Sequence, residues 1–247
     1  MRCLLAILAV LILGSPTVAA GADLNPPHGD PAYRRFTVFS PDAAGPEAVR
    51  DDVIVVFHGL TSAVPNGTFK RVRKLFLQSH TVIGINYDPL DIDRTRTFLD
   101  RVAADWLPGQ RGRRAVIFGT SMGAIWADYF GHRIGAPKVV LLNPVTDPAT
   151  QLSSHVGTVR NERRNEAMLI EQATLDRYGE LETAANTATS RLVVLTSDDG
   201  AFDYRTAFDA FVGRDRTDVL VFATGGHTID LRKHAARRFI RAFVLND

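Results

Sequence analysis

Cysteine is almost absent from this chain, since its 247 residues include only Cys3. One thiol excludes a disulfide framework and the cysteine clusters that hold structural zinc. Metal and nucleotide motifs are lacking too: there is no HExxH, no EF-hand loop, no GxGxxG after the first expected strand and no phosphate-loop lysine. We therefore expect neither a metal nor a cofactor.

The chain also lacks an excess of one charge, because it has 29 Lys and Arg residues and 27 Asp and Glu residues, for a net charge of +2. The basic residues are scattered, and the short clusters within 71–74, 111–114 and 160–164 are expected to be solvated surface. This distribution gives no electrostatic case for a nucleic-acid partner.

The chain has no apolar run of the roughly twenty residues that a membrane-spanning helix needs. A shorter run at residues 3–13 follows the positive Arg2 and precedes the small residues Val18-Ala19-Ala20, a pattern typical of a secretory signal peptide. We expect residues 1–20 to be removed. The mature protein would then be periplasmic or secreted, with no stable membrane anchor and no cysteine.

What the chain does have is a regular alternation of β-rich and helical segments after an irregular, proline-containing lead-in at 21–33. This pattern predicts one α/β domain over 21–247, with a mainly parallel sheet and helices on both faces. The expected strands are 35–40, 53–57, 81–87, 115–119, 138–142, 192–195 and 218–223. The expected helices are 68–79, 94–106, 122–133 and 231–243.

About fifty residues separate the strands 138–142 and 192–195, which is long for a simple crossover. Residues 161–181 within this stretch are charged and have helical spacing. We expect a small helical insertion, forming a cap over the strand ends somewhere within 150–188, or else a solvated helix that fills the crossover.

The segment Gly119-Thr120-Ser121-Met122-Gly123 follows an expected strand and opens an expected helix. A serine at such a turn is exposed as a nucleophile, and glycines two positions either side remove steric clashes. The alternative is that Ser121 only caps the helix.

Three further strand ends fit the same chemistry, since parallel sheets gather ligands at the carboxyl ends of their strands. His227 is the expected base, Asp198 the expected acid, and the order serine, acid, histidine is that of an α/β-hydrolase triad. The backbone amides of Leu60 and Met122 are the expected oxyanion donors.

Other residues compete for these roles. Asp199, Asp203 and Asp147 are alternative acids, and His58 is an alternative base whose HG turn favours a structural role. The remaining histidines are expected to be surface or structural residues: His28, His80, His132, His155 and His234.

The chain resembles the α/β-hydrolase superfamily, and within it the small bacterial serine esterases of the YqiA type. The segments that carry this resemblance are FHGLTS at 57–62, GTSMGA at 119–124, LLNPVTDP at 141–148, TSDDGAFDYRTA at 196–207 and GGHTID at 225–230. The resemblance implies an α/β-hydrolase fold and esterase activity on short acyl esters or thioesters. We expect the small helical insertion to follow the sixth strand. Ser197 stands where the family has glycine, and one extra residue precedes Asp203, which leaves Asp198 and Asp199 open as the acid. The distance from Thr196 favours Asp198.

These observations predict an exported serine hydrolase that cleaves a small-molecule or envelope-linked acyl ester through an acyl-enzyme. Two alternatives remain: an acyltransferase that uses the same triad on a cell-envelope glycan or lipid, and a non-catalytic interaction protein that keeps the fold.

Overall fold

The computed structural model describes residues 36–39, 52–109, 114–161, 165–181 and 188–246. The expected signal peptide and the lead-in lie outside the described residues. Within these ranges, no helix is both long and apolar enough to cross a membrane.

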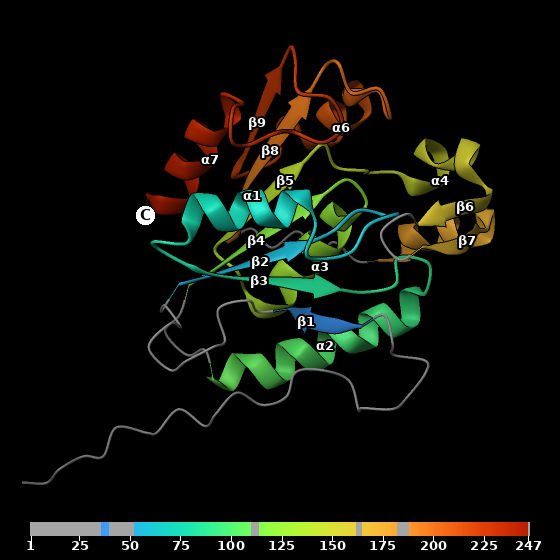
Figure 1. Cartoon of the computed structure of the whole chain (residues 1–247), viewed down its shortest axis with the longest axis horizontal. Helices are drawn as coiled ribbons and strands as arrows, with labels where there is room; N and C mark the ends of the chain where they lie inside the picture. Colours follow the sequence, from blue (N-terminus) through green and yellow to red (C-terminus); the bar gives the residue numbers. More distant parts are fainter. Residues whose placement is uncertain (1–35, 40–51, 110–113, 162–164, 182–187, 247) are drawn as a thin grey trace, which may run out of the picture.

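A seven-stranded sheet forms the centre of the molecule (Figure 1). Its strands lie in the order β1-β3-β2-β4-β5-β8-β9, and only β1 runs antiparallel to its neighbour. The strands are β1 (Thr37–Phe39), β2 (Val53–Phe57), β3 (Thr81–Asn86), β4 (Ala115–Thr120), β5 (Lys138–Leu142), β8 (Ser190–Thr196) and β9 (Thr217–Phe222). The prediction of a mainly parallel sheet is confirmed.

Helices cover both faces, and this explains why every residue of β2 is buried. One face packs against α1 (Gly67–Phe76) and α7 (Ala236–Leu245), through side chains such as Phe69 and Ile240. The other face packs against α2 (Ile92–Gly109), α3 (Gly123–Ile134) and α6 (Tyr204–Phe211). Because alternate strand residues point to opposite faces, Val55 and Phe57 belong to the second core, while Ile54 and Val56 belong to the first.

The insertion differs from its prediction. It follows β5, the fifth strand along this chain, and its central part is not helical. It comprises α4 (Pro148–Gln151), a 3-10 turn η2 (Ser153–His155), an antiparallel hairpin of β6 (Gly157–Asn161) and β7 (Glu166–Ile170), then α5 (Gln172–Asp176) and a second 3-10 turn η3 (Arg177–Glu180). Positive φ angles at Gly157 and Asn165 lie at the start of β6 and just before β7.

Buried aromatic side chains attach this insertion to the sheet domain. The hydroxyl of Tyr178 in η3 accepts a hydrogen bond from the indole of Trp126 on α3 at 3.1 Å, and it donates to the carbonyl of Pro89 after β3. The insertion is therefore packed beside the second core and shares it with α3.

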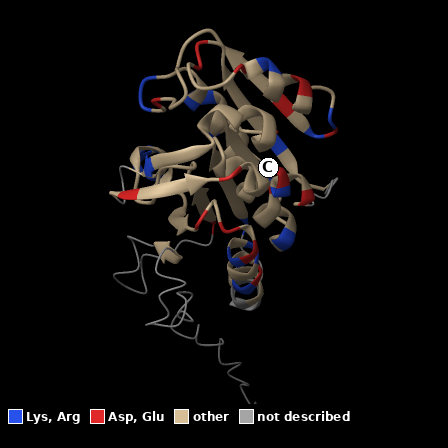
Figure 2. Ribbon diagram, turned by 90° about the vertical axis from the view of Figure 1, so that its right-hand side faces the viewer, with Lys and Arg blue, Asp and Glu red and all other residues tan. Residues whose placement is uncertain are grey.

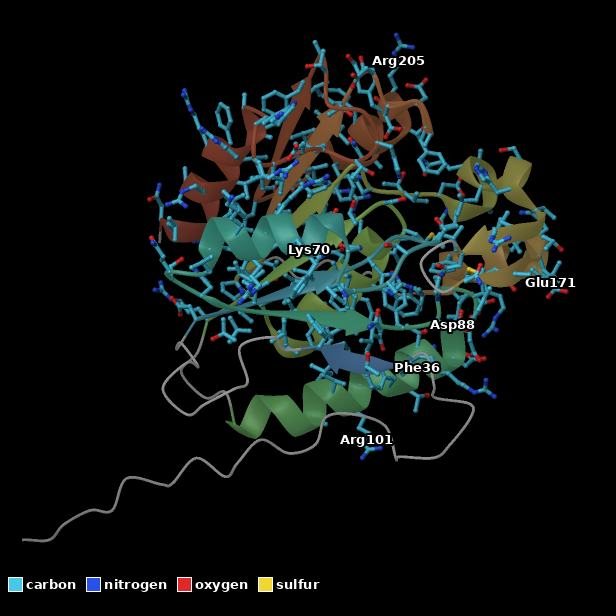
Figure 3. The ribbon with its side chains drawn as sticks, viewed as in Figure 1. Phe36, Lys70, Asp88, Arg101, Glu171 and Arg205 are labelled. Carbon is cyan, nitrogen blue, oxygen red and sulfur yellow. The ribbon has the colours of Figure 1, made fainter. Side chains whose placement is uncertain are left out.

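Charged side chains are of both signs and are interspersed over the visible helices and loops (Figure 2). Lys70 on α1 and Arg205 on α6, both labelled in Figure 3, are exposed. Residues of the two signs alternate along the ribbon in this view, in keeping with the near-balanced composition.

Candidate active site

Ser121 stands at the turn between β4 and α3, with a φ of 54°, a left-handed conformation that a residue with a side chain rarely adopts. The glycines around it are sterically required. A Cβ atom on Gly119 would lie 2.5 Å from the Cα of Ala124, and one on Gly123 would lie 2.3 Å from the carbonyl oxygen of His58. The turn is thus the strained strand-to-helix arrangement that presents a serine side chain beyond the sheet.

The turn is fixed to its neighbours by backbone hydrogen bonds. The amide of Ser121 donates to the carbonyl of Leu142 at the end of β5, at 3.0 Å. Its carbonyl accepts from the amides of Ala124 and Val145, at 3.0 and 3.2 Å. Such bonds hold the strained residue in place.

Ser121 and His227 line the same cavity, which has a volume of about 450 Å³. Leu60 and Met122, the expected sources of the oxyanion donors, line it too. Ala201 and Phe202, after β8, also line it, so four strand ends contribute to one space, as expected for a parallel sheet. The insertion contributes Leu152 and His155, whereas none of the described residues of 161–181 lines this cavity.

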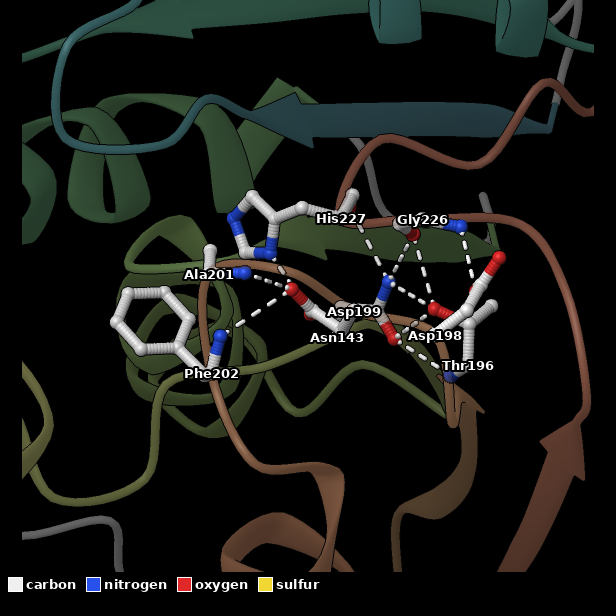
Figure 4. A network of polar contacts seen from close by, with 8 residues as sticks. All are labelled: Asn143, Thr196, Asp198, Asp199, Ala201, Phe202, Gly226 and His227. Atoms are coloured by element: carbon white, nitrogen blue, oxygen red, sulfur yellow. Dashed lines mark hydrogen bonds and ion pairs between the residues drawn. The ribbon is translucent and has the colours of Figure 1, made fainter.

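The carboxylate that contacts the histidine is Asp199. Its Oδ2 lies 2.8 Å from Nδ1 of His227, and the side chain is only 4% exposed (Figure 4). Its other oxygen accepts hydrogen bonds from the amides of Ala201 and Phe202, at 2.8 and 3.2 Å. The sequence favoured Asp198 for this place and left Asp199 open, and in the structure it is Asp199 that contacts His227.

Asp198 holds the backbone of the histidine turn instead. Its carboxylate accepts from the amides of Gly226 at 2.8 Å and Gly225 at 3.1 Å. Both glycines have positive φ angles, 148° for Gly225 and 60° for Gly226, so the turn needs residues that tolerate them. The side chain points along the turn rather than toward the imidazole because these amides occupy both of its oxygens.

Hydrogen bonds lower the pKa of both carboxyls. Burial raises the pKa of Asp199, but the hydrogen bond with His227 and the amides of Ala201 and Phe202 outweigh it, and the net pKa is below the usual value. The amide of Gly226 is the main cause of the lowered pKa of Asp198. Each carboxyl is therefore held in its charged form at neutral pH.

Asn143, after β5, joins the loops that carry Asp199 and His227, and the sequence analysis did not single it out. Its amide nitrogen donates to the carbonyls of Gly226 and His227, at 2.9 and 3.2 Å, and its oxygen accepts from the amide of Thr196 at 2.9 Å (Figure 4). It is 4% exposed and has a φ of 41°. The sequence signal that could have identified it was an asparagine directly after a strand end, because asparagine tolerates a positive φ.

The competing candidates have other partners. Asp203 caps α6 by accepting from the amide of Arg205, and Asp147 caps α4 by accepting from the amide of Thr150. His58 is fully buried and stacks on Tyr87 with ring centroids 4.4 Å apart. These contacts support structural roles for all three.

Among the remaining histidines, His155 lines the cavity and His80 is buried beside Phe76. His234 packs on Phe222, and His132 lies in the last turn of α3. His28 lies outside the described residues. In the part of the chain that the structure describes, no group of three or more His, Cys, Asp or Glu side chains could hold a metal ion.

Residues 53–236 match the sequence profile of a family described as "Uncharacterised protein family (UPF0227)". A search of curated proteins gave no match.

Solved structures share the fold at low sequence identity. A putative hydrolase from Agrobacterium vitis S4 is 16% identical with a TM-score of 0.59, over 84% of this chain and 91% of that one. Est1E from Butyrivibrio proteoclasticus, also solved with ferulic acid bound, is 11% identical with a TM-score of 0.59, over 85% and 94%. An alpha/beta superfamily hydrolase from Oenococcus oeni PSU-1 is 15% identical with a TM-score of 0.52, over 86% and 96%. The predicted α/β-hydrolase fold is confirmed.

Proposed function

Since the chain belongs to the uncharacterised protein family UPF0227 and has the α/β-hydrolase fold, we propose that it is a serine esterase with Ser121, His227 and Asp199 as its triad. The observation that carries this proposal is the contact of Asp199 with the far side of His227, while that histidine shares a cavity with the strained Ser121. A buried carboxylate in this position fixes the imidazole tautomer and stabilises the imidazolium.

The proposed reaction begins when the hydroxyl oxygen of Ser121 attacks the ester carbonyl and its proton passes to Nε2 of His227. The amides of Leu60 and Met122 stabilise the negative oxygen of the tetrahedral intermediate. Its collapse breaks the bond to the alcohol, which leaves with the proton from His227. A water molecule, deprotonated by His227, then attacks the acyl-serine, releases the acid and restores the hydroxyl of Ser121.

A panel of 4-nitrophenyl esters of graded acyl length, with a feruloyl ester because Est1E was solved with ferulic acid, tests this proposal. Ser121→Ala should lower kcat by at least about a thousandfold, since a triad acts as a unit. The control is Ser197→Ala, because Ser197 also directly follows a strand end but lies outside this cavity. The control should retain wild-type activity. Undiminished activity in Ser121→Ala would overturn the proposal.

The acyltransferase alternative differs only in the acceptor of the acyl group. Adding candidate glycan acceptors to the same assay separates the two, because acyl transfer lowers the yield of free acid for each alcohol released. A constant ratio of one acid to one alcohol identifies hydrolysis.

Export is part of the proposal and is supported by the apolar segment after Arg2. A mature protein whose first residue is Gly21, measured by intact mass after expression from the full gene, is the expected result. A chain that retains Cys3 in the purified soluble protein would contradict it.

A further inference from the structure

The cavity of Ser121 has an uneven distribution of charge. Among its described lining residues Arg71 is the only one with a permanent charge, and no carboxylate lines it. Hydroxyl and amide side chains form much of the remaining polar wall: Thr61, Ser62, Asn66, Thr68, Thr120 and Thr228. An apolar part of the wall comes from Leu152 and Phe202. A cavity for a purely hydrocarbon acyl chain has no need for a guanidinium.

Arg71 is held at this wall. It projects from α1 with its side chain 21% exposed, and a Cβ atom on Gly67 would lie 3.6 Å from its guanidinium carbon. The guanidinium thus folds back over the first turn of the helix. Lys70, the preceding residue, is exposed (Figure 3). It does not line the cavity.

The neighbouring carboxylate of Asp230 neutralises Arg71 only in part, because it is engaged more closely with a second arginine. Arg232 donates to both oxygens of Asp230, at 2.9 and 2.8 Å, whereas Nε of Arg71 lies 3.4 Å from it. The hydrogen bond from Arg232 is the main cause of the lowered pKa of Asp230. Two arginines and one carboxylate leave a net charge of +1, and Arg71 is the member that lines the cavity.

Arg71 also has unused donors. Its only other contact among the described residues is a long hydrogen bond of 3.4 Å from Nη1 to the carbonyl of Ile229. A guanidinium has five N–H donors in a planar fork that matches carboxylate and phosphate groups. The fork of Arg71 is therefore available to a ligand in the cavity.

We propose that the cavity selects esters that carry an anionic group, a carboxylate or a phosphate, which Arg71 binds while Ser121 attacks the ester carbonyl. This inference rests on the proposed esterase function. It places the anionic end of the substrate at α1 and leaves Leu152 and Phe202 to contact its apolar part.

Two matched pairs of substrates test the inference in wild-type protein. On the acyl side, 4-nitrophenyl hemiadipate is compared with 4-nitrophenyl hexanoate, which has the same chain length without the carboxylate. On the alcohol side, 1-acetylglycerol 3-phosphate is compared with 1-acetylglycerol. The expected result is a kcat/KM at least about tenfold higher for the anionic member of one pair, since hydrogen bonds to charged groups are the stronger ones. The pair that shows it identifies where the anionic group lies.

Arg71→Met should abolish that preference, lowering the anionic-to-neutral ratio of kcat/KM by about tenfold or more, and Arg71→Lys should restore part of it. The matched control is Arg241→Met, because Arg241 lies on α7 outside the cavity and its loss changes the net charge equally. This control should leave the ratio unchanged.

Asp230→Asn should act in the opposite direction, because it removes the carboxylate that competes for Arg71, and the ratio should rise. Ratios near one in wild type, or unchanged ratios in both Arg71 variants, would overturn the inference while leaving the esterase intact. Failure of the esterase proposal is distinct, because activity on every ester would then survive Ser121→Ala.

Discussion

At the scale of single residues, two adjacent aspartates share the task of holding His227. Asp199 contacts the ring, and Asp198 holds the amides of Gly225 and Gly226 that precede it. One carboxylate sets the orientation of the imidazole, while the other sets the path of the backbone from which it projects. Substituting each aspartate should therefore lower the activity by a different amount.

Asp199→Asn should lower kcat by about four orders of magnitude, as removal of the carboxylate does in comparable triads. Asp198→Asn keeps the contact between Asp199 and His227, so we expect a loss of kcat below about a hundredfold. Steady-state kinetics on one neutral ester compares the two. Equal losses, or a larger loss in Asp198→Asn, would contradict the assignment.

The sequence could locate the acid only to within these two residues. Both follow β8, and which of the two reaches the histidine depends on the backbone turn after Thr196. That turn is fixed by contacts from residues distant in sequence, such as Asn143. That Ser121 and His227 line one cavity was more predictable, because their sequence surroundings, GTSMG and the turn after a strand, are local.

At the scale of secondary-structure elements, the site depends on the ends of β4, β5 and β8 staying in register. Asn143 joins the end of β5 to that of β8 and to the histidine turn, through the amide of Thr196 and the carbonyls of Gly226 and His227. Its side chain does not line the cavity. We therefore regard it as a positioning residue that acts through His227.

Asn143→Ala should lower the free energy of unfolding by about 1–3 kcal/mol, because buried partners lose their hydrogen bonds. It should also lower kcat with little change in KM, since the substrate does not contact it. Urea unfolding and steady-state kinetics measure the two effects. Asn165→Ala is the matched control, because Asn165 also has a positive φ but is exposed on the hairpin.

If a folded Asn143→Ala protein kept the wild-type kcat, Asn143 would have only a structural role and would not position His227. The control should retain wild-type kcat, and any loss of stability that it shows gives the cost of the backbone conformation together with the exposed hydrogen bond that Asn165 accepts from Arg160.

The sequence predicted some helices and strands correctly and others not. Strands such as Val53–Phe57 are continuous apolar runs that only a covered strand explains. The insertion was predicted only in part: α5 and η3 are helical as expected, but β6 and β7 form a hairpin. The polar side chains there match helical spacing, while tertiary contacts decide the structure, with Met168 and Ile170 of β7 buried in the second core. Helix α6 was missed because it is only eight residues long.

At the scale of the whole molecule, carboxyls with lowered pKa values gather in the segments between β8 and α7. Asp198, Asp199 and Asp230 all have pKa values below their ordinary 3.8. A carboxyl of this kind contributes stability that is fully present above its unfolded pKa and is lost as the pH falls through its folded pKa. The causes lie in Gly226, His227 and Arg232, so this part of the fold depends on charged carboxylates.

The free energy of unfolding should consequently fall as the pH decreases below about 4. In Asp198→Asn/Asp199→Asn the decrease should be shallower, because two of the responsible groups are gone. Urea unfolding midpoints at a series of pH values between about 6 and 2.5 measure both slopes. The same slope in wild type and the double variant would contradict this origin of acid sensitivity.

The central claim is that Ser121 is a nucleophile activated by His227 and Asp199. Its most direct test is reaction of the folded protein with a fluorophosphonate, followed by mass spectrometry of the labelled peptides. One adduct at Ser121, formed far more slowly in His227→Ala, is the predicted result. Folded wild-type protein that carries no label at Ser121, or carries its label on another residue, would contradict the account.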